Sequence, residues 1–126
     1  MTDPRPASGV PAARPRSGLT VRWSLADAPE GVEEALAAYI ADTSYDRFSA
    51  LPGLAFKTWQ MVPGEWFEGC YVFADDATRA DFQEEFSAGA ADAPGSVIIG
   101  SPPVLIEACA VVAIAEGPAG FHPTRS

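Results

Sequence analysis

The sequence predicts a single α+β domain in which one antiparallel sheet of four strands carries two helices. Segments with apolar residues at every second position alternate with segments at helical spacing, in the order β-α-β-β-α-β. Pro-Gly pairs at residues 52–53 and 63–64 separate the central segments. The chain of 126 residues fits one domain, and its 48% hydrophobic content is enough for a packed core.

The first expected strand covers residues 19–25. Apolar and polar residues alternate strictly along it, which is typical of a half-buried strand, and the apolar positions are Leu19, Val21, Trp23 and Leu25. Four of the 12 prolines fall within the first 15 residues, where large aliphatic side chains are almost absent. Such a segment buries too little surface to offset the entropy of ordering it. We therefore expect residues 1–18 to form a disordered, Pro-rich arm.

A helix is predicted for residues 29–41. Asp27 is the expected N-cap and Pro29 suits the first turn, and three glutamates near this end favour the positive end of the helix. The helix can continue, frayed, towards Phe48 before Pro52 stops it. Its buried stripe is expected to comprise Val32, Leu36, Tyr39, Ile40 and Thr43.

The next two segments, residues 54–62 and 66–74, are expected to pair as an antiparallel hairpin. Along the first of them the alternation places Leu54, Phe56, Thr58, Gln60 and Val62 on one face and Ala55, Lys57, Trp59 and Met61 on the other. Both faces of the second are largely apolar, so we expect something to cover each face.

The second helix is expected to start at an N-cap, Asp75 or Asp76, and to reach about Phe86. Residues 89–103 are rich in Ala, Gly and Pro and are interpreted as an irregular connection. The nearly continuous apolar run at residues 104–115 predicts a long fourth strand. The domain is thus placed at residues 19–117 and a flexible tail at 118–126.

This order of elements is that of the ferredoxin-like fold. Both helices then cover the same face of the sheet and leave the other face bare. An apolar bare face has to be buried, and the simplest solution is a two-fold dimer with sheet packed against sheet. The expected partner is therefore a second copy of this chain.

Charge and hydropathy exclude two classes of partner. The formal net charge is −9, and residues 19–117 hold four basic and 16 acidic side chains. Such a surface repels phosphate groups, so nucleic-acid binding is not expected. The sequence has no run of about 18 apolar residues, so we expect no membrane span. The N-terminus lacks the apolar stretch of a signal peptide, so we expect a cytoplasmic protein.

The cysteines and the histidine do not form a metal-binding pattern. Cys70 and Cys109 lack CxxC spacing, and His122 is the one histidine of the sequence. A zinc site needs about four ligands. We expect two free, buried thiols and no cofactor. Walker, Rossmann and Ser-His-Asp patterns are also absent from the sequence.

Two short motifs carry a resemblance to a known family. Residues 52–59 read PGLxxKxW, and residues 69–73 read GCYVF, close to GGxYLF, with Cys70 in place of the second glycine. Together with the acidic start of the second helix, these motifs resemble the YdhR-like monooxygenase family of the dimeric α+β barrel superfamily. The resemblance covers roughly residues 19–115.

The resemblance implies a hydrophobic pocket between sheet and helices in each protomer. Some relatives oxidise aromatic polyketides with dioxygen and without metal or flavin. A deprotonated phenol or enol can give an electron directly to dioxygen, provided that the protein binds the ring, removes a proton and excludes water. The expected aromatic walls are Trp59, Trp66, Tyr71, Phe56, Phe82 and Trp23, and the expected polar groups are Tyr71, Lys57, Arg22 and Gln60.

Two further residues are candidates for the base, and several of the expected site residues also have a purely structural interpretation. Glu107 could be a base if buried, and His122 is the natural base by type but lies in a Pro/Gly tail. Lys57 could instead pair with Glu68 or Glu107 across strands, and Arg22 could form a similar ion pair. Trp59, Trp23 and Tyr71 could be core or interface residues.

Three functions remain open at this stage. The first is a cofactor-independent monooxygenase for a small aromatic or polyketide-like substrate, with dioxygen as co-substrate. The second is a non-oxidative cyclase or isomerase that uses the same pocket. The third is a small-molecule-binding or structural dimer without turnover, in which Trp59, Tyr71 and Phe82 fill the pocket themselves.

Overall fold

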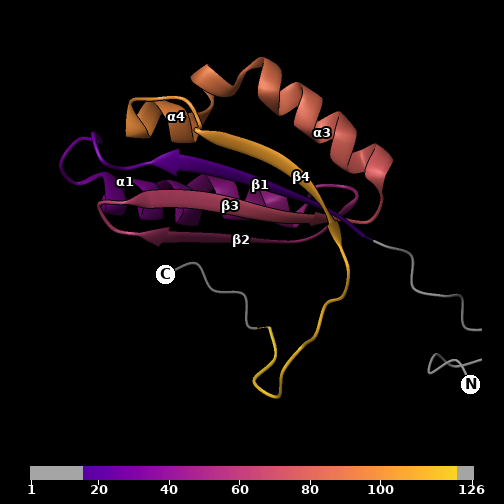
Figure 1. Ribbon diagram of the computed structural model, residues 1–126. Helices are drawn as coiled ribbons and strands as arrows, with labels where there is room; N and C mark the ends of the chain where they lie inside the picture. Colours follow the sequence, from indigo (N-terminus) through magenta and orange to yellow (C-terminus); the bar gives the residue numbers. More distant parts are fainter. Residues whose placement is uncertain (1–15, 122–126) are drawn as a thin grey trace, which may run out of the picture.

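The computed structural model describes residues 16–121 and has an α+β fold with one four-stranded antiparallel sheet (Figure 1). The strands are β1 Arg16–Ser24, β2 Leu54–Val62, β3 Trp66–Phe73 and β4 Leu105–Val111. Their order in the sheet is β2-β3-β1-β4, so β1 and β3 are central. The helices are α1 Val32–Tyr39, α2 Tyr45–Ser49, α3 Asp76–Ala88 and α4 Pro94–Ile99, with a π-helical turn at Ile40–Ser44 and a 3₁₀ turn at Ala90–Asp92.

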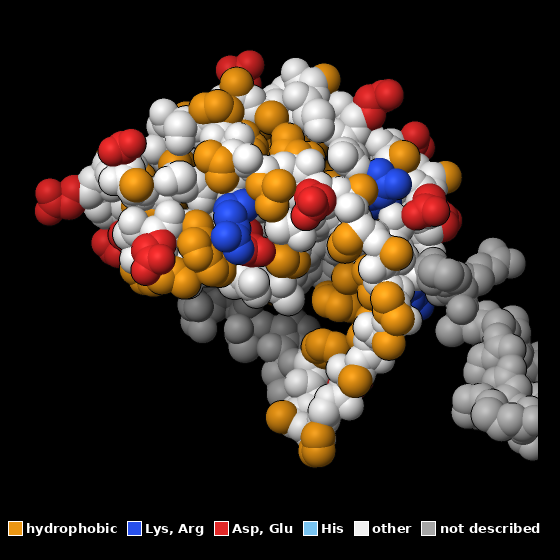
Figure 2. All heavy atoms as spheres, viewed as in Figure 1, with side chains coloured by type: hydrophobic (Ala, Val, Ile, Leu, Met, Phe, Trp, Pro, Cys, Tyr) orange, Lys and Arg blue, Asp and Glu red, His pale blue; other side chains and the backbone are white. Residues whose placement is uncertain are grey.

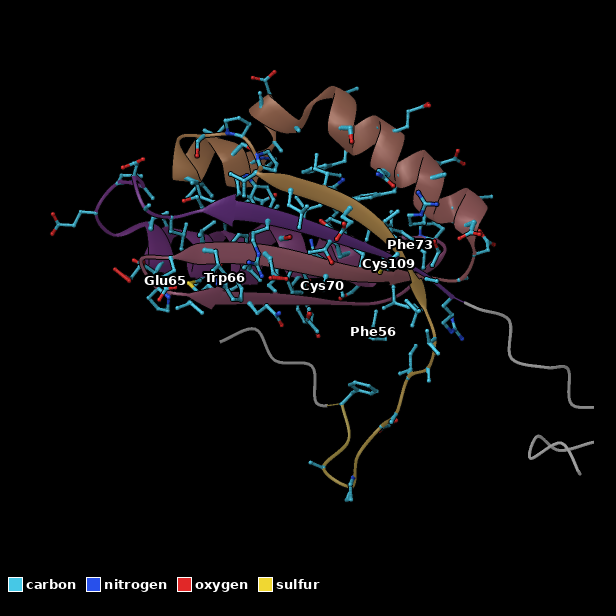
Figure 3. All side chains as sticks on the ribbon, in the orientation of Figure 1. Phe56, Glu65, Trp66, Cys70, Phe73 and Cys109 are labelled. Carbon is cyan, nitrogen blue, oxygen red and sulfur yellow. The ribbon has the colours of Figure 1, made fainter. Side chains whose placement is uncertain are left out.

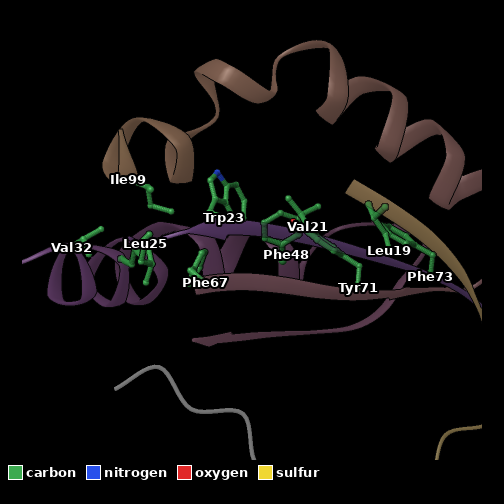
Figure 4. Packing of buried hydrophobic residues seen from close by; sticks show 11 residues of the cluster. Leu19, Val21, Trp23, Leu25, Val32, Phe48, Phe67, Tyr71, Phe73 and Ile99 are labelled. Atoms are coloured by element: carbon green, nitrogen blue, oxygen red, sulfur yellow. The ribbon is translucent and has the colours of Figure 1, made fainter. Parts of the chain in front are cut away.

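The hydrophobic core lies between one face of the sheet and all four helices (Figure 4). The pairing of β1 with β3 sets Leu19 opposite Tyr71 and Trp23 opposite Phe67, so their side chains share this face. The helices contribute Val32, Leu36, Phe48 and Ile99 to the same cluster. The strict alternation predicted for the first strand is therefore confirmed, and it decides which side of the sheet the helices cover.

The first helix differs from the prediction at both ends. Its N-cap is Gly31, with φ 82°, and not Asp27, because residues 25–32 first form turns whose backbone hydrogen bonds run from Ala28 N to Leu25 O and from Val32 N to Pro29 O. At the other end, the π-helical turn inserts one extra residue into the helical repeat. That shift exposes Thr43, which was expected to be buried, and buries Ser44 instead.

Residues 89–103 were predicted to be irregular, and this prediction was wrong for α4. Pro94 occupies its first turn, and Gly100 follows it with φ 89°. Pro at the start and a left-handed Gly just past the end are helix boundary signals, which the sequence reading took for loop composition. The indole N–H of Trp23 donates to Ser96 Oγ at 2.9 Å, and Ser96 donates onward to the Ala90 carbonyl at 2.6 Å.

The remaining boundaries are mostly as predicted. Asp75 caps α3 by accepting a hydrogen bond from the Thr78 amide at 2.8 Å, and β2 has the predicted bounds. A β-bulge lies between Leu54 and Phe56. The two side chains were expected on the same face of the sheet, but they lie on opposite faces. β1 starts at Arg16, inside the predicted arm, and β4 ends at Val111 rather than at residue 115. The rest of the arm and the end of the tail lie outside the described residues.

After β4 the chain leaves the sheet and loops below the face opposite to α3 (Figure 1). Hydrophobic side chains occur along this stretch (Figure 2), including Val112 and Ile114. At its end the Phe121 ring lies 5.6 Å from the Phe56 ring of β2, measured between centroids. No helix among residues 16–121 is long and apolar enough to cross a membrane.

Candidate functional site

A cavity of about 50 Å³ lies on the helix side of the sheet. Its walls come from all three strands β1 to β3, from α1, the π-helical turn and α2, and from the chain between α3 and α4. Lys57 and Arg47 are the charged residues of its lining, and no carboxylate belongs to it. A volume of this size holds a few water-sized molecules and is well below the roughly 300–1,000 Å³ of a site for a drug-sized ligand.

Lys57 lies in an aromatic box inside this cavity. Its Nζ is 3.4 Å from the ring centroid of Phe48, 4.3 Å from that of Tyr71 and 4.5 Å from that of Trp59. Within residues 16–121 it takes part in no ion pair; the predicted cross-strand partners lie on the other face of the sheet. The alternative that Lys57 pairs with Glu68 or Glu107 is therefore wrong.

Local sequence explains how the lysine reaches this position. The two-residue period of β2 turns Lys57 towards the helices, directly opposite Tyr71 of β3. Gly69, two residues before Tyr71, provides the space: a Cβ there would lie 3.2 Å from Lys57 Cε and 3.3 Å from Tyr71 Cε1. The GCYVF motif thus contributes an absent side chain as well as a tyrosine.

The electrostatics of the site favour a neutral amine beside a protonated phenol. Burial lowers the pKa of Lys57 well below its usual value of 10.5, and the positive charge of Arg47 lowers it further. Burial raises the pKa of the Tyr71 hydroxyl above its usual value of 10.0. Tyr71 is therefore suited to donate hydrogen bonds and not to act as a phenolate base.

Three residues of the site were missed by sequence reasoning. The π-helical turn and α2 bring Ser44, Arg47 and Phe48 to the cavity, where Ser44 and Phe48 are buried. The Arg47 guanidinium carbon lies 4.7 Å from the Phe48 ring centroid. In the sequence, the one signal for these residues is Phe48. It lies four positions after Ser44, so the two residues share a helix face, but they continue the buried stripe of the first helix only if the helical repeat shifts by one residue.

A larger cleft, of about 520 Å³, runs along the free edge of β2. It shares the residues Phe48, Lys57 and Trp59 with the inner cavity, so Lys57 lines both spaces. Phe121 lines the cleft from the segment after β4, and most of the other lining residues are apolar or aromatic. A ligand in this cleft would reach Lys57 from the sheet edge.

Besides Gln60, four of the expected site residues lie on the opposite face of the sheet. These are Phe56 and Trp66 (Figure 3), together with Arg22 and Glu107, because their positions in the strands have the other parity. Arg22 Nη2 donates to Glu68 Oε1 at 2.6 Å, which confirms the predicted cross-strand ion pair, and its guanidinium lies 4.2 Å from the Trp66 ring centroid. Glu107 is exposed and lacks the burial expected of a base.

The other expected residues divide in a similar way. Trp23, Trp59 and Tyr71 line the cavity beside Lys57, as expected. Phe82 packs beside it, 5.0 Å from the Tyr71 ring and 5.4 Å from the Phe73 ring, without lining it. Gln60 is exposed on the face opposite to the helices. His122 lies outside the described residues.

The thiols and carboxylates of residues 16–121 do not form a metal centre. No group of three or more His, Cys, Asp or Glu side chains among them could hold a metal ion. Both cysteines are free, and Cys109 is exposed rather than buried as expected. The Cys70 thiol donates to Glu68 Oε2 at 3.2 Å, and burial together with this carboxylate raises the thiol pKa.

Comparison with known proteins supports the fold and leaves the function open. No protein-family model matches the chain, and no curated protein matches it. A solved structure that resembles it is the crystal structure of the NE2512 protein of unknown function from Nitrosomonas europaea, with a TM-score of 0.62 and 28% sequence identity. That match covers 86% of this chain and 100% of the other.

Proposed function

We propose that this protein is a cofactor-independent oxygenase-like enzyme that acts on a small phenol or enol of aromatic or polyketide type. One observation carries the proposal: a lysine amine is held among aromatic rings in a cavity whose lining contains no carboxylate. Such an amine can remove a proton and then balance the charge of the resulting anion. The resemblance to the YdhR-like monooxygenase family supports the same reaction class.

The proposed reaction uses Lys57 as the base. The neutral amine takes a proton from the substrate, and the ammonium so formed faces the rings of Phe48, Trp59 and Tyr71, which stabilise a cation. Arg47 adds a second positive charge near the substrate anion. The anion gives an electron to dioxygen, and the resulting pair combines to a peroxide. Loss of water from the peroxide leaves one oxygen atom in the product, so no external reductant is needed.

The dimensions of the two spaces set the expected pose of the substrate. An aromatic polyketide does not fit into about 50 Å³, whereas the neighbouring cleft of about 520 Å³ is within the usual range for small-molecule sites. We therefore place the ring system in the cleft beside Phe56 and Trp59, with the acidic group directed at Lys57.

Oxygen consumption tests the proposal. Purified, EDTA-treated protein is mixed with a panel of anthrone-like phenols and hydroquinones, and oxygen uptake and product mass are recorded. We expect uptake above the spontaneous rate, one added oxygen atom in the product and a loss of about 100-fold or more in kcat/KM for Lys57→Met. Glu107→Gln, on the opposite face, is the matched control and should retain the rate.

Other outcomes of this assay point elsewhere. A product of unchanged mass without oxygen uptake would replace the oxygenase by a cyclase or isomerase that uses the same base. Equal rates for wild type and Lys57→Met would remove Lys57 from the reaction.

A binding protein without turnover is the second candidate, and the ring packing favours it. Phe48, Tyr71 and Phe82 contact one another with centroid distances of 5.0 to 6.0 Å, so aromatic side chains fill most of the layer beside the cavity. Isothermal titration with the same panel separates this candidate from the first. Binding at the cleft with neither oxygen uptake nor chemical change would favour it.

We further propose that the fold is of the ferredoxin-like type and that two copies form a dimeric α+β barrel. The strand order β2-β3-β1-β4 with antiparallel neighbours supports the fold type. The sheet face away from the helices carries Phe56, Trp66 and Leu105; Phe121 packs on Phe56, and no helix among residues 16–121 covers the rest of this face.

The oligomeric state of the protein in solution tests the proposed barrel. Sedimentation velocity should give twice the chain mass of 13.2 kDa, and Leu105→Asp on the bare face should shift the protein to monomer. Val97→Asp is the matched control, since Val97 is an exposed apolar residue of α4, in the helix layer. A wild-type protein that sediments as a monomer would remove the barrel.

A further inference from the structure

Lys57 is the only lysine in the sequence, and every other basic side chain apart from the histidine is an arginine. For an exposed charge or an ion pair, arginine serves as well as lysine or better. An arginine, however, stays protonated and offers no nucleophilic lone pair near neutral pH. The one position that carries a lysine is therefore the cavity position, where a primary amine can do what a guanidinium cannot.

The geometry around Nζ leaves its lone pair available. The amine contacts three aromatic rings and is not tied to a carboxylate of the described residues, and Lys57 lines both the inner cavity and the cleft. Gly69 leaves room for the end of the side chain, because a Cβ there would crowd Lys57 Cε. The amine is thus shielded from most of the solvent, and Lys57 borders the cleft from which a ligand would approach it.

We propose that Lys57 is a nucleophile that condenses with the carbonyl group of a small aldehyde or ketone to form an imine. The nitrogen lone pair attacks the carbonyl carbon, the C=O π pair moves to oxygen, and a proton passes from nitrogen to oxygen. The carbinolamine then loses its hydroxyl as water while the C=N bond forms. The net change is amine plus carbonyl to imine plus water, so no oxidant or reductant is consumed.

The surroundings favour each stage of this condensation. The lowered pKa of Lys57 increases the fraction of neutral amine at pH 7, and each unit of lowering increases it about tenfold. Tyr71, whose raised pKa keeps it protonated, lines the same cavity and can donate a hydrogen bond to the oxygen of the carbonyl compound. The aromatic rings packed around Lys57 Nζ limit the access of water, which would otherwise hydrolyse the imine.

The lining also defines the class of carbonyl compound. The cleft is built from Tyr45, Phe48, Leu54, Phe56, Trp59 and Phe121, so its occupant should be aromatic or otherwise apolar around the carbonyl group. The structure offers no acidic group in either space that would repel a negative substituent. We therefore assign aromatic aldehydes and ketones as the ligand class. The condensation needs no dioxygen, so its test is independent of the proposed oxygenase.

Reductive trapping with benzaldehyde tests the inference. The full-length protein is incubated at pH 7 with benzaldehyde and sodium cyanoborohydride, and peptide mass mapping follows benzylation of the lysine and of the terminal amine. The matched control is the double variant Lys57→Arg/Thr43→Lys, which moves the only lysine to an exposed position of the π-helical turn that lines neither space. We expect the wild-type lysine to react at least about tenfold faster than the lysine of this variant.

The result that would overturn the inference is equal or slower labelling of Lys57 than of the control lysine. If the double variant does not fold, as judged by its circular dichroism spectrum, the terminal amine of the wild type serves as the reference. Its ordinary pKa of about 7.7–8.0 makes it the more reactive amine in most proteins at pH 7. Labelling of Lys57 at a rate equal to or above that of the terminal amine supports the inference, and slower labelling overturns it.

Discussion

Replacing Lys57 by methionine is expected to raise the free energy of unfolding at pH 7 by about 1 kcal/mol or more, although it removes the proposed base. Methionine keeps an unbranched stem of similar length and fits among Phe48, Trp59 and Tyr71. The amine, in contrast, must be dehydrated or deprotonated when the chain folds. Urea unfolding followed by circular dichroism measures the difference, with Gln60→Met, an exposed position of the same strand, as the control.

The stability difference should depend on pH in a defined direction. Because the pKa of Lys57 is lower in the folded state than its usual value of 10.5, the unfolded chain binds more protons between these two pKa values. Wild-type stability therefore rises with pH across this window, by at most about 1.4 kcal/mol per pH unit, and the Lys57→Met variant lacks this contribution. The advantage of the variant should be largest below the folded pKa and should fade as pH approaches 10.5. A Lys57→Met variant that is less stable than the wild type at pH 7, or a stability difference that does not change with pH, would contradict this explanation.

Replacing Phe73 by alanine is expected to lower the free energy of unfolding by about 3–5 kcal/mol. Phe73, at the end of β3, is 0% exposed, and its ring centroid lies 6.0 Å from that of Tyr71 and 5.4 Å from that of Phe82. A loss of that size is a large fraction of the roughly 5–15 kcal/mol that stabilises a typical domain. Val112→Ala, at a position that is 95% exposed, should change stability by less than about 0.5 kcal/mol. A cost below about 1 kcal/mol for Phe73→Ala would mean that the layer beside the cavity is not packed as described.

The sheet could be predicted from the sequence because its signals are local. Strict alternation marks Leu19 to Leu25, and Pro-Gly pairs delimit β2 so clearly that its predicted and observed bounds agree. The helix ends could not be predicted in the same way. The choice of Gly31 over Asp27 as N-cap depends on the turns that precede it, and the π-helical turn depends on the packing of Ser44 and Phe48 against the sheet.

The site could be predicted in part, and the residues that were wrongly assigned to it share one cause. Lys57, Trp59 and Tyr71 were expected together and line the same cavity. Phe56 and Arg22 were added to that group although the strand period already placed Phe56 away from Lys57. The family resemblance pointed to a pocket without assigning a face of the sheet, so residues of both faces were combined. The register that sets Lys57 opposite Tyr71 becomes visible only once the hairpin is paired.

Both proposals for Lys57 need an amine that gives up its proton more readily than an exposed lysine does, and a titration of that amine tests them together. Because the chain contains a single lysine, protein labelled with ¹³C-lysine gives one side-chain signal that needs no further assignment. Its chemical shift can be followed by NMR against pH, with the double variant Lys57→Arg/Thr43→Lys as the reference for an exposed lysine. The account predicts a midpoint well below 10.5 for Lys57. A midpoint at or above that value would show an ordinary ammonium held by the aromatic rings, and would remove Lys57 as both base and nucleophile.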